Sequence, residues 1–193
     1  MSTVTLINAF EVPPEADEAF VAGWERARDF LAGQEGFSAT ALHRALRADA
    51  EFRFVNVARV EARKRAVADA EFPGAQMPFK AHPGLYEVVH EDGAPDGAEG
   101  VILINAFEVP AEADDQFLAG WQRARELLGG QAGYLGTRLH RSLGPAAEFR
   151  FVNIARWSSP LAFSKAVERP AFREAGADIP FASHPALYQV IRD

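Results

Sequence analysis

The chain has 193 residues, of which 48% are apolar, and it carries a net charge of −7. This length fits one ordinary domain or two small ones, and the apolar fraction is large enough to build a core. Because the charge balance is acidic and no Lys/Arg cluster is long enough to follow a phosphate backbone, we expect no nucleic-acid partner.

Targeting and membrane signals are missing from the sequence. No run of 18 apolar residues occurs, so we expect no membrane-spanning helix and no membrane partner. The first residues, MSTVTLINAFEV, lack the basic and apolar regions of a signal peptide, and the chain contains no cysteine. These features favour a cytoplasmic protein and exclude thiolate catalysis, disulfides and cysteine-ligated metal centres.

The sequence repeats itself once. The segment LINAFEVPPEADEAF begins at Leu6, and LINAFEVPAEADDQF begins 97 positions later at Leu103. The copies diverge after their third strand and realign at HPGLYEVV and HPALYQVI, the first copy being five residues shorter. We therefore predict a first repeat over residues 1–91, with a degenerate second helix, and a second repeat over residues 98–193 that holds the working site. The acidic, Gly- and Pro-rich stretch 90–100 is expected to be an exposed linker.

Each repeat predicts the order strand, helix, strand, strand, helix, strand. In the second repeat, residues 101–109 are rich in β-branched and apolar side chains, and the apolar spacing becomes helical from Asp114 until Gly129 and Gly130. Residues 136–143 and 148–157 predict two more strands. Ser159 is a typical N-cap with Pro160 at the first helical position, and residues 186–191 predict the last strand.

This order is typical of a ferredoxin-like unit, an antiparallel sheet with two helices on one face. The other face also needs a cover, because Val152 and Ile154 on it are apolar. We therefore predict an α+β fold in which two ferredoxin-like (β-α-β-β-α-β) units pack their sheets as an intramolecular pseudo-dimeric α+β barrel. The duplication would replace a homodimer, although a further homodimer of this monomer stays open.

One face of the predicted strand 148–157 combines apolar side chains with an amide, because side chains alternate along a strand. Its members are Phe149, Phe151, Asn153, Ala155 and Trp157. The first strand likewise places Asn105 among apolar groups. A buried amide costs about 1–3 kcal/mol unless it is hydrogen-bonded. The amides either satisfy backbone groups near the strand ends or are the few polar groups of a mostly apolar ligand site.

The motifs INAFEV, GYLGTRLHR and VNIARW followed by SSPLAF resemble antibiotic biosynthesis monooxygenase (ABM) domains of the dimeric α+β barrel superfamily. In the cofactor-independent members that oxidise polycyclic aromatic polyketides, Asn and Trp stand in the same N-x-x-x-W arrangement, which maps onto Asn153 and Trp157. The resemblance implies a monooxygenase of secondary metabolism that uses O₂ on an aromatic polyketide-like phenol, without a cofactor or metal. Those enzymes carry a tyrosine six residues after the tryptophan, where this chain has Phe163.

The resemblance also implies roles for individual residues. Asn153 would hydrogen-bond the oxyanion and Trp157 would stack on the ring system or donate to it, which makes these two the catalytic candidates. Asn105 would line the opposite wall. His140 is a candidate base or lining residue, since imidazole titrates near neutral pH. The substrate-binding candidates are Asn105, Phe107, Phe149, Phe151, Phe163, His140 and Trp121.

Two other functions stay open. One is a non-catalytic ligand-binding or cyclase-like protein for polyketide intermediates. The other is the haem-degrading activity of the same superfamily, which uses a first-strand Asn, a helical Trp and a haem-ligating His. Asn105 fits the first of these, but Ala166 and Gly176 stand near the positions of the other two, so haem degradation is disfavoured.

The two copies differ where the catalytic candidates lie, since Val60 stands in the first copy at the position of Trp157. This favours a working site in the second copy only. Each copy also carries two histidines about 40 residues apart, without the close spacing of metal ligands. We therefore interpret these four as structural or pocket-lining residues: His43, His82, His140 and His184.

Overall fold

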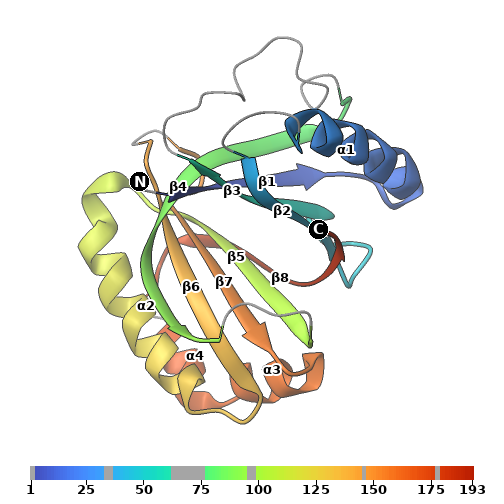
Figure 1. Cartoon of the computed structure of the whole chain (residues 1–193). Coiled ribbons are helices and arrows are strands. Elements are labelled where there is room, and N and C mark those ends of the chain that lie inside the picture. The colour runs from blue at the N-terminus through green and yellow to red at the C-terminus, as the bar shows by residue number, and fades with distance from the viewer. Residues whose placement is uncertain (1–2, 33–36, 62–76, 95–98, 145–146, 177–178) are drawn as a thin grey trace. The chain divides into compact units, whose positions relative to one another are not determined.

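The structure is a computed structural model that describes residues 3–32, 37–61, 77–94, 99–144, 147–176 and 179–193. It divides into two compact units (Figure 1): unit 1 comprises residues 1–87 and 190–193, and unit 2 comprises residues 88–189. The degenerate second helix expected in the first repeat falls on residues 62–76, outside the described residues.

In the described residues of unit 1, the helix α1 packs on an antiparallel sheet. Strand β1 pairs with β3 and β4, and β2 pairs with β3. Phe20 and Trp24 of the helix pack with Phe10, Leu42 and Phe54 of the sheet. The elements are β1 (Thr3–Glu11), a 3₁₀ turn η1 (Pro14–Ala16), α1 (Asp17–Ala32), β2 (Phe37–Ala45), β3 (Phe54–Glu61) and most of β4 (Lys80–Gly93).

Unit 2 repeats this arrangement with further helices. Strand β5 pairs antiparallel with β7 and β8, β6 pairs with β7, and the end of β4 runs beside β6. The elements are β5 (Val101–Glu108), η4 (Ala111–Ala113), α2 (Asp114–Gly129), β6 (Tyr134–Ser142), β7 (Phe151–Trp157), α3 (Pro160–Val167), α4 (Pro170–Gly176) and β8 (Ala182–Arg192).

The hydrogen-bonded strand order β1-β3-β2-β8-β5-β7-β6-β4 returns to its start, which is the connectivity of a closed eight-stranded barrel. The predicted α+β fold with two ferredoxin-like halves is confirmed. Two strands continue from one unit into the other, since residues 88–93 of β4 belong to unit 2 and the last residues of β8 belong to unit 1.

The predicted linker begins too early. Residues 90–93 form the end of β4, because backbone pairing with β6 outweighs their turn-like composition. Ala94 N–H continues this contact by donating to the Leu135 carbonyl at 2.7 Å. Gly93 has a φ of 63°, and a Cβ there would collide with the same carbonyl. The role of this glycine is therefore to permit a close approach of two strands, and not to make a linker flexible.

Local signals placed both ends of α2 correctly, whereas β6 and β8 begin two and four residues earlier than predicted and β7 begins three residues later. Ser159 Oγ accepts a hydrogen bond from Ala162 N at 3.1 Å, so the predicted N-cap is confirmed. The second helix is split, with α3 ending at Val167 and α4 beginning at Pro170, since proline cannot continue a helix. Leu143, the last residue of the predicted strand 136–143, lies beyond the end of β6 and is exposed.

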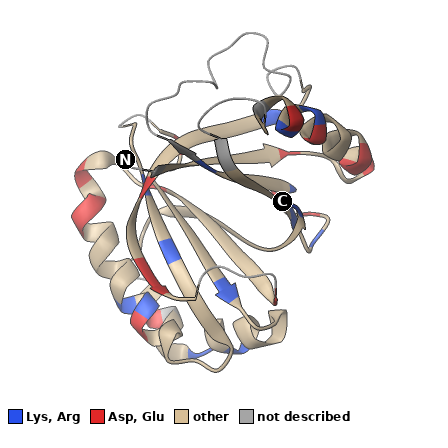
Figure 2. Ribbon diagram, viewed as in Figure 1, with Lys and Arg blue, Asp and Glu red and all other residues tan. Residues whose placement is uncertain are grey.

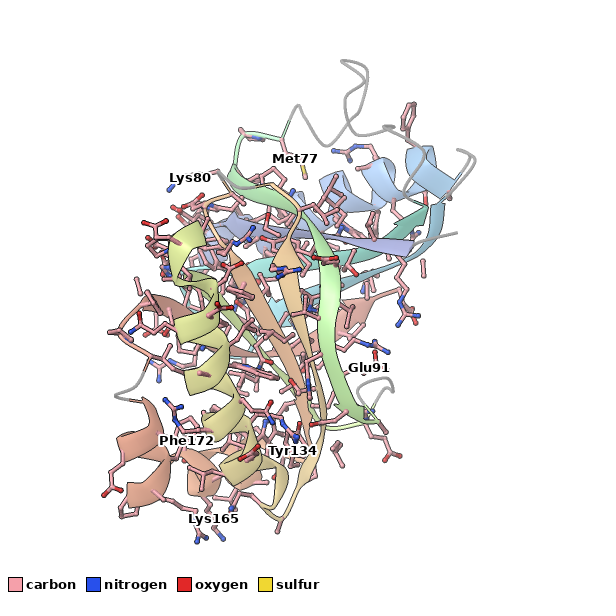
Figure 3. All side chains as sticks on the ribbon, turned by 90° about the vertical axis from the view of Figure 1, so that its left-hand side faces the viewer. Met77, Lys80, Glu91, Tyr134, Lys165 and Phe172 are labelled. Atoms are coloured by element: carbon pink, nitrogen blue, oxygen red, sulfur yellow. The ribbon has the colours of Figure 1, made fainter. Side chains whose placement is uncertain are left out.

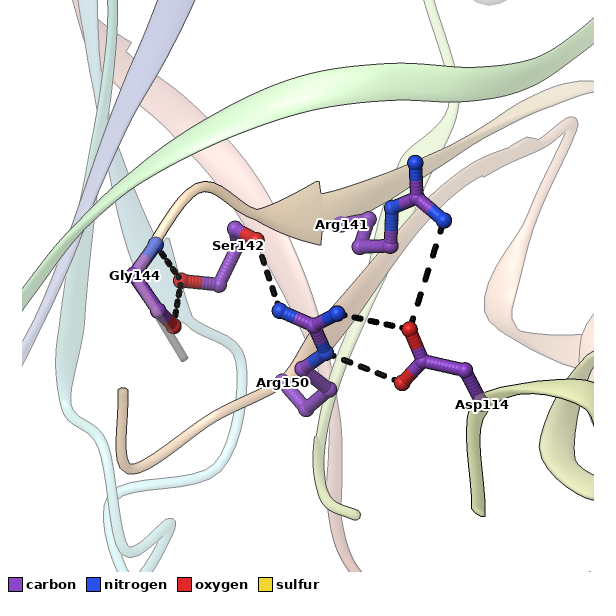
Figure 4. A network of polar contacts seen from close by, with 5 residues as sticks. All are labelled: Asp114, Arg141, Ser142, Gly144 and Arg150. Carbon is purple, nitrogen blue, oxygen red and sulfur yellow. Dashed lines mark hydrogen bonds and ion pairs between the residues drawn. The ribbon is translucent and has the colours of Figure 1, made fainter. Parts of the chain in front are cut away.

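The start of α2 is tied to the sheet by a bidentate ion pair (Figure 4). Arg150 donates from Nε and Nη2 to the Asp114 carboxylate at 2.9 and 2.6 Å, and from Nη1 to the Ser142 carbonyl at 2.9 Å. Arg53 and Asp17 make the equivalent contacts in unit 1 at 2.9 and 2.6 Å. This clamp positions the helices over both sheets.

Asp114→Asn is expected to lower the free energy of unfolding by about 2–3 kcal/mol, because it weakens partly buried, charge-assisted hydrogen bonds. Asp115→Asn is the matched control: it removes an exposed carboxylate from the same helical turn, and should cost less than about 1 kcal/mol. Urea unfolding of the two variants measures both values. Equal losses would contradict a special role for the clamp.

None of the helices in the described part of the chain is long and apolar enough to span a membrane.

Candidate functional site

Strand β7 carries the predicted mixture of one amide and several apolar side chains on its helix-facing side. Phe151 packs with Phe117 of α2, and Trp157 packs with Ala166 of α3. Asn153 lies between them along the strand and is 9% exposed. The shared face inferred from strand alternation is therefore observed, and it points toward the helices of unit 2.

The two amides of unit 2 are neighbours. Asn105 of β5 and Asn153 of β7 are register partners in the antiparallel ladder. Asn153 Oδ1 accepts a hydrogen bond from Thr137 Oγ1 at 2.7 Å, whereas the buried Asn105 Oδ1 has no hydrogen-bond partner. Asn105 thus lies beside Asn153 rather than on an opposite wall, because directly paired residues of adjacent strands point to the same face.

Trp157 is fully buried, and its indole N–H has no acceptor. Its neighbours include Val101 and Leu103 of β5, and two rings meet it edge to face with centroids 5.5 Å away, those of Tyr134 and Phe163. A donor left without a partner in such surroundings costs about 1–3 kcal/mol. The side chains around Trp157 must move before a ligand can reach it.

A second polar group lies at the end of β4, close to α2 and β6. Tyr134 Oη donates to Asp92 Oδ1 at 2.6 Å, while Arg125 Nη1 and His90 Nε2 lie 3.0 and 3.5 Å from Asp92 Oδ2. The His90 ring meets Trp121 edge to face at 5.1 Å. Figure 2 shows this acidic strand end next to basic segments of α2 and β6, and Figure 3 places Tyr134 near the end of β4 that carries Glu91.

The surroundings of Tyr134 keep its hydroxyl group protonated. Burial, the hydrogen bond to Asp92 and the negative charge of that carboxylate raise the pKa of Tyr134 above its ordinary value, against a smaller opposing effect of Arg125. Tyr134 therefore stays protonated as a donor. The contacts of Asp92 Oδ2 are ion-pair distances without hydrogen-bond geometry, so His90 Nε2, Asp92 Oδ2 and Arg125 Nε are buried atoms without a hydrogen-bond partner.

Sequence reasoning missed this second group. His90 and Asp92 were assigned to a linker, and Tyr134 was part of a family motif without a site role. A usable signal was the comparison of the copies, since Tyr134 corresponds to Phe37 just as Trp157 corresponds to Val60. Tyr134 also supplies a phenol next to Trp157, although α3 carries Phe163 at the position where the related oxygenases carry tyrosine.

Most of the remaining predicted aromatic residues pack away from Trp157. Phe117 stacks on Phe151 at 4.3 Å and meets Phe107 at 4.8 Å, so these rings fill the core under α2. Phe149 lies 5.3 Å from His184, and Trp121 packs in the α2 core. Of the predicted aromatic lining residues, Phe163 is the one that the structure brings against Trp157.

His140 lies on the opposite side of the sheet from Asn153. Its neighbour Leu139 packs in the α2 core, and alternation turns His140 away. Its Nδ1 lies 3.2 Å from the Val152 carbonyl. Burial is the main cause that lowers the pKa of His140 to about 4. His140 is thus a neutral structural residue at pH 7 and is not brought to the site as a base.

Unit 1 satisfies the amide oxygen of Asn56 internally, whereas Asn8 Oδ1, like Asn105 Oδ1 in unit 2, is buried without a hydrogen-bond partner. Trp24 Nε1 donates to Asn56 Oδ1 at 3.0 Å, and Thr40 donates to the same oxygen at 2.7 Å. In unit 2, Trp121 corresponds to Trp24 but makes no such bond within the described residues; it contacts His90 instead. The two repeats therefore share a fold and differ in how their polar groups are satisfied.

Metal ligation finds no support at the histidines. His82 and His184 each pair with one carboxylate, Glu11 at 3.0 Å and Glu108 at 2.9 Å. Over the residues that the structure describes, no three side chains of His, Cys, Asp or Glu gather in a way that could hold an ion.

The family model described as antibiotic biosynthesis monooxygenase (ABM) matches residues 3–57 and 100–178, one segment in each repeat. The chain belongs to this family. The resemblance carried by INAFEV and VNIARW is thereby confirmed. No curated protein matches this ABM chain.

Solved structures share the fold of this ABM protein. An anthrone oxidase-like protein is 15% identical with a TM-score of 0.81, covering 100% of this chain and 92% of its own. A ferredoxin-fold protein related to antibiotic biosynthesis monooxygenases from Listeria monocytogenes 4b F2365 is 16% identical with a TM-score of 0.59, covering 100% and 97%. The haem-degrading enzyme LmHde from Listeria monocytogenes is 17% identical with a TM-score of 0.55, covering 97% and 99%. Identities this low show the fold alone.

Proposed function

We propose that this ABM protein is a cofactor-independent monooxygenase that uses O₂ to oxidise an aromatic, polyketide-like phenol in secondary metabolism. The reaction takes place in unit 2, on the helix-facing side of β5 and β7. The observation that carries the proposal is the buried Nε1–H of Trp157, which has no acceptor and lies in an aromatic cluster with Tyr134 and Phe163. Such a donor is costly unless a ligand satisfies it.

The proposed chemistry needs only the substrate and O₂. The phenol is ionised, and its electron-rich ring then transfers electrons to O₂. For an anthrone-type substrate, a CH₂ carbon loses two hydrogens and four electrons, one oxygen atom becomes the new carbonyl oxygen, and the other leaves as water. The balance closes without a reductant.

The protein contributes donors for the negative charge. Asn153 Oδ1 already accepts a hydrogen bond from Thr137 Oγ1. The Nδ2 hydrogens of Asn153 are therefore the ones that donate to the oxyanion of the substrate. The Trp157 N–H is a second donor. Preorganised donors of this kind stabilise developing charge strongly in a site that excludes water.

Unit 2 is favoured over unit 1 because Trp157 supplies a buried indole donor that has no acceptor. In unit 1 the indole of Trp24 is already bonded to Asn56, and Val60 offers no donor at the Trp157 position. The likeness in fold to an anthrone oxidase-like protein agrees with the proposed substrate class.

A binding or cyclase-like protein for polyketide intermediates is the second candidate, favoured by the complete burial of Trp157. Oxygen uptake separates the two functions. Purified protein treated with a chelator should consume one O₂ per anthrone-type phenol and place one atom of ¹⁸O from ¹⁸O₂ in the product, without added cofactor. Tight binding with no oxygen uptake above the rate without protein would contradict the oxygenase and support the binder.

A further inference from the structure

We propose that His90 is the general base of the unit 2 site and that its Nε2 accepts the proton of the substrate phenol. The inference rests on the proposed function only for the oxidation that follows. It adds a catalytic residue that lies on the end of β4, a segment whose sequence is that of a linker, and it lets the enzyme use phenols that arrive in their neutral form.

The position of His90 suits a proton acceptor. Its Nε2 is a buried atom without a hydrogen-bond partner, while the side chain as a whole is 29% exposed. The ring is held edge to face against Trp121 at 5.1 Å. Asp92 Oδ2, 3.5 Å from Nε2, makes no hydrogen bond with it, so this nitrogen can accept a proton from a ligand once the side chains that bury it move.

The groups around His90 match the charges that the proton transfer creates. Asp92 of β4 lies 3.5 Å from it, Arg125 of α2 and Tyr134 of β6 contact the same carboxylate, and Tyr134 remains neutral. When the phenol O–H bond breaks and an N–H bond forms at Nε2, the imidazolium lies 3.5 Å from Asp92 Oδ2 and is stabilised by it. The phenolate can accept from the unused Nε–H of Arg125.

Asp92 acts as a positioning residue in this arrangement. Tyr134 holds one carboxylate oxygen at 2.6 Å, and Arg125 lies 3.0 Å from the other. The same Tyr134 ring lies 5.5 Å from Trp157. One tyrosine therefore contacts both the carboxylate beside the base and the indole donor, so a substrate that reaches His90 and Trp157 extends along Tyr134, which favours a fused-ring phenol.

Unit 1 has no equivalent base. The realigned segments HPGLYEVVH and HPALYQVIR place Arg192 at the position of His90. Arg192 Nε donates to Glu25 at 2.6 Å, which makes a surface ion pair instead. The difference between the repeats at this strand end coincides with the differences at Tyr134 and Trp157.

Binding under anaerobic conditions tests the inference apart from oxidation. The probe is an anthrone-type phenol at a pH where the free ligand is neutral. Wild-type protein should produce the phenolate absorption band on binding, and His90→Gln should reduce that band about tenfold or more at equal occupancy. His184→Gln, which changes a histidine paired with Glu108 at the end of unit 2, should keep it. A missing phenolate band in the wild type, or an equal band in His90→Gln, would overturn the inference.

Turnover in air adds a second comparison. For a neutral phenol, His90→Gln should lower the oxygenation rate about 100-fold, whereas an analogue ionised in solution by an electron-withdrawing substituent should lose less than about threefold. An equal loss on both substrates would assign His90 a structural role and overturn the proposal. A phenolate band without oxygen uptake would uphold the base and reject the oxygenase.

Discussion

Asn153→Ala and Trp157→Phe are each expected to lower kcat/KM for oxygenation by about 100-fold, the typical loss when one donor to a developing oxyanion is removed. The corresponding change in unit 1, Asn56→Ala, is expected to leave kcat/KM within about twofold, because the proposed reaction is confined to unit 2. Oxygen-electrode assays of the three variants, with folding checked by circular dichroism, measure these values.

Stability separates this result from simple damage to the fold. Trp157→Phe removes an indole N–H that has no acceptor, so the change in unfolding free energy should stay within about 1 kcal/mol while activity falls. Asn56→Ala removes the acceptor of Trp24 and Thr40 and should cost about 1–3 kcal/mol while activity remains. If activity follows stability across the set, the site assignment fails.

The duplication made the fold predictable. Once Leu6 and Leu103 were aligned, the order of strands and helices followed from apolar spacing, and Ser159 with Pro160 marked a helix start that the structure confirms. Alternation along β7 likewise placed Asn153 and Trp157 on one buried face. These inferences depend on local periodicity, which can be read directly from the sequence.

The rest of the site depends on contacts that no local pattern encodes. Arg125 meets Asp92 and Tyr134 meets Asp92 because β4 continues past its own unit to lie beside β6. Gly93 permits this close approach, but it lies in a Gly- and Pro-rich stretch whose composition is typical of a linker. His140 was a different error, since the alternation that placed Asn153 toward the helices also placed His140 away from them.

The unfolding free energy is expected to fall by about 4 kcal/mol between about pH 7.5 and about pH 5 because of His43 and His140. Both imidazoles are buried, which is the main cause that lowers each pKa from 6.5 to about 4, and each Nδ1 lies near a backbone carbonyl. Between those pKa values the unfolded chain binds protons that the folded chain does not. Stability is therefore complete above about pH 6.5 and is lost as the pH falls toward about 4.

Substitution by glutamine separates these two histidines from the carboxylates that also titrate in acid. His43→Gln and His140→Gln should each remove about half of the pH-dependent loss, and the double variant most of it, because burial lowers the pKa of each imidazole to about 4. Each histidine contributes up to about 1.4 kcal/mol per pH unit in this window. Urea unfolding at several pH values gives the slopes, and the comparison of slopes is unaffected by a constant destabilisation from the substitution. If the double variant keeps the wild-type slope of unfolding free energy against pH, groups other than these two imidazoles cause the destabilisation in acid.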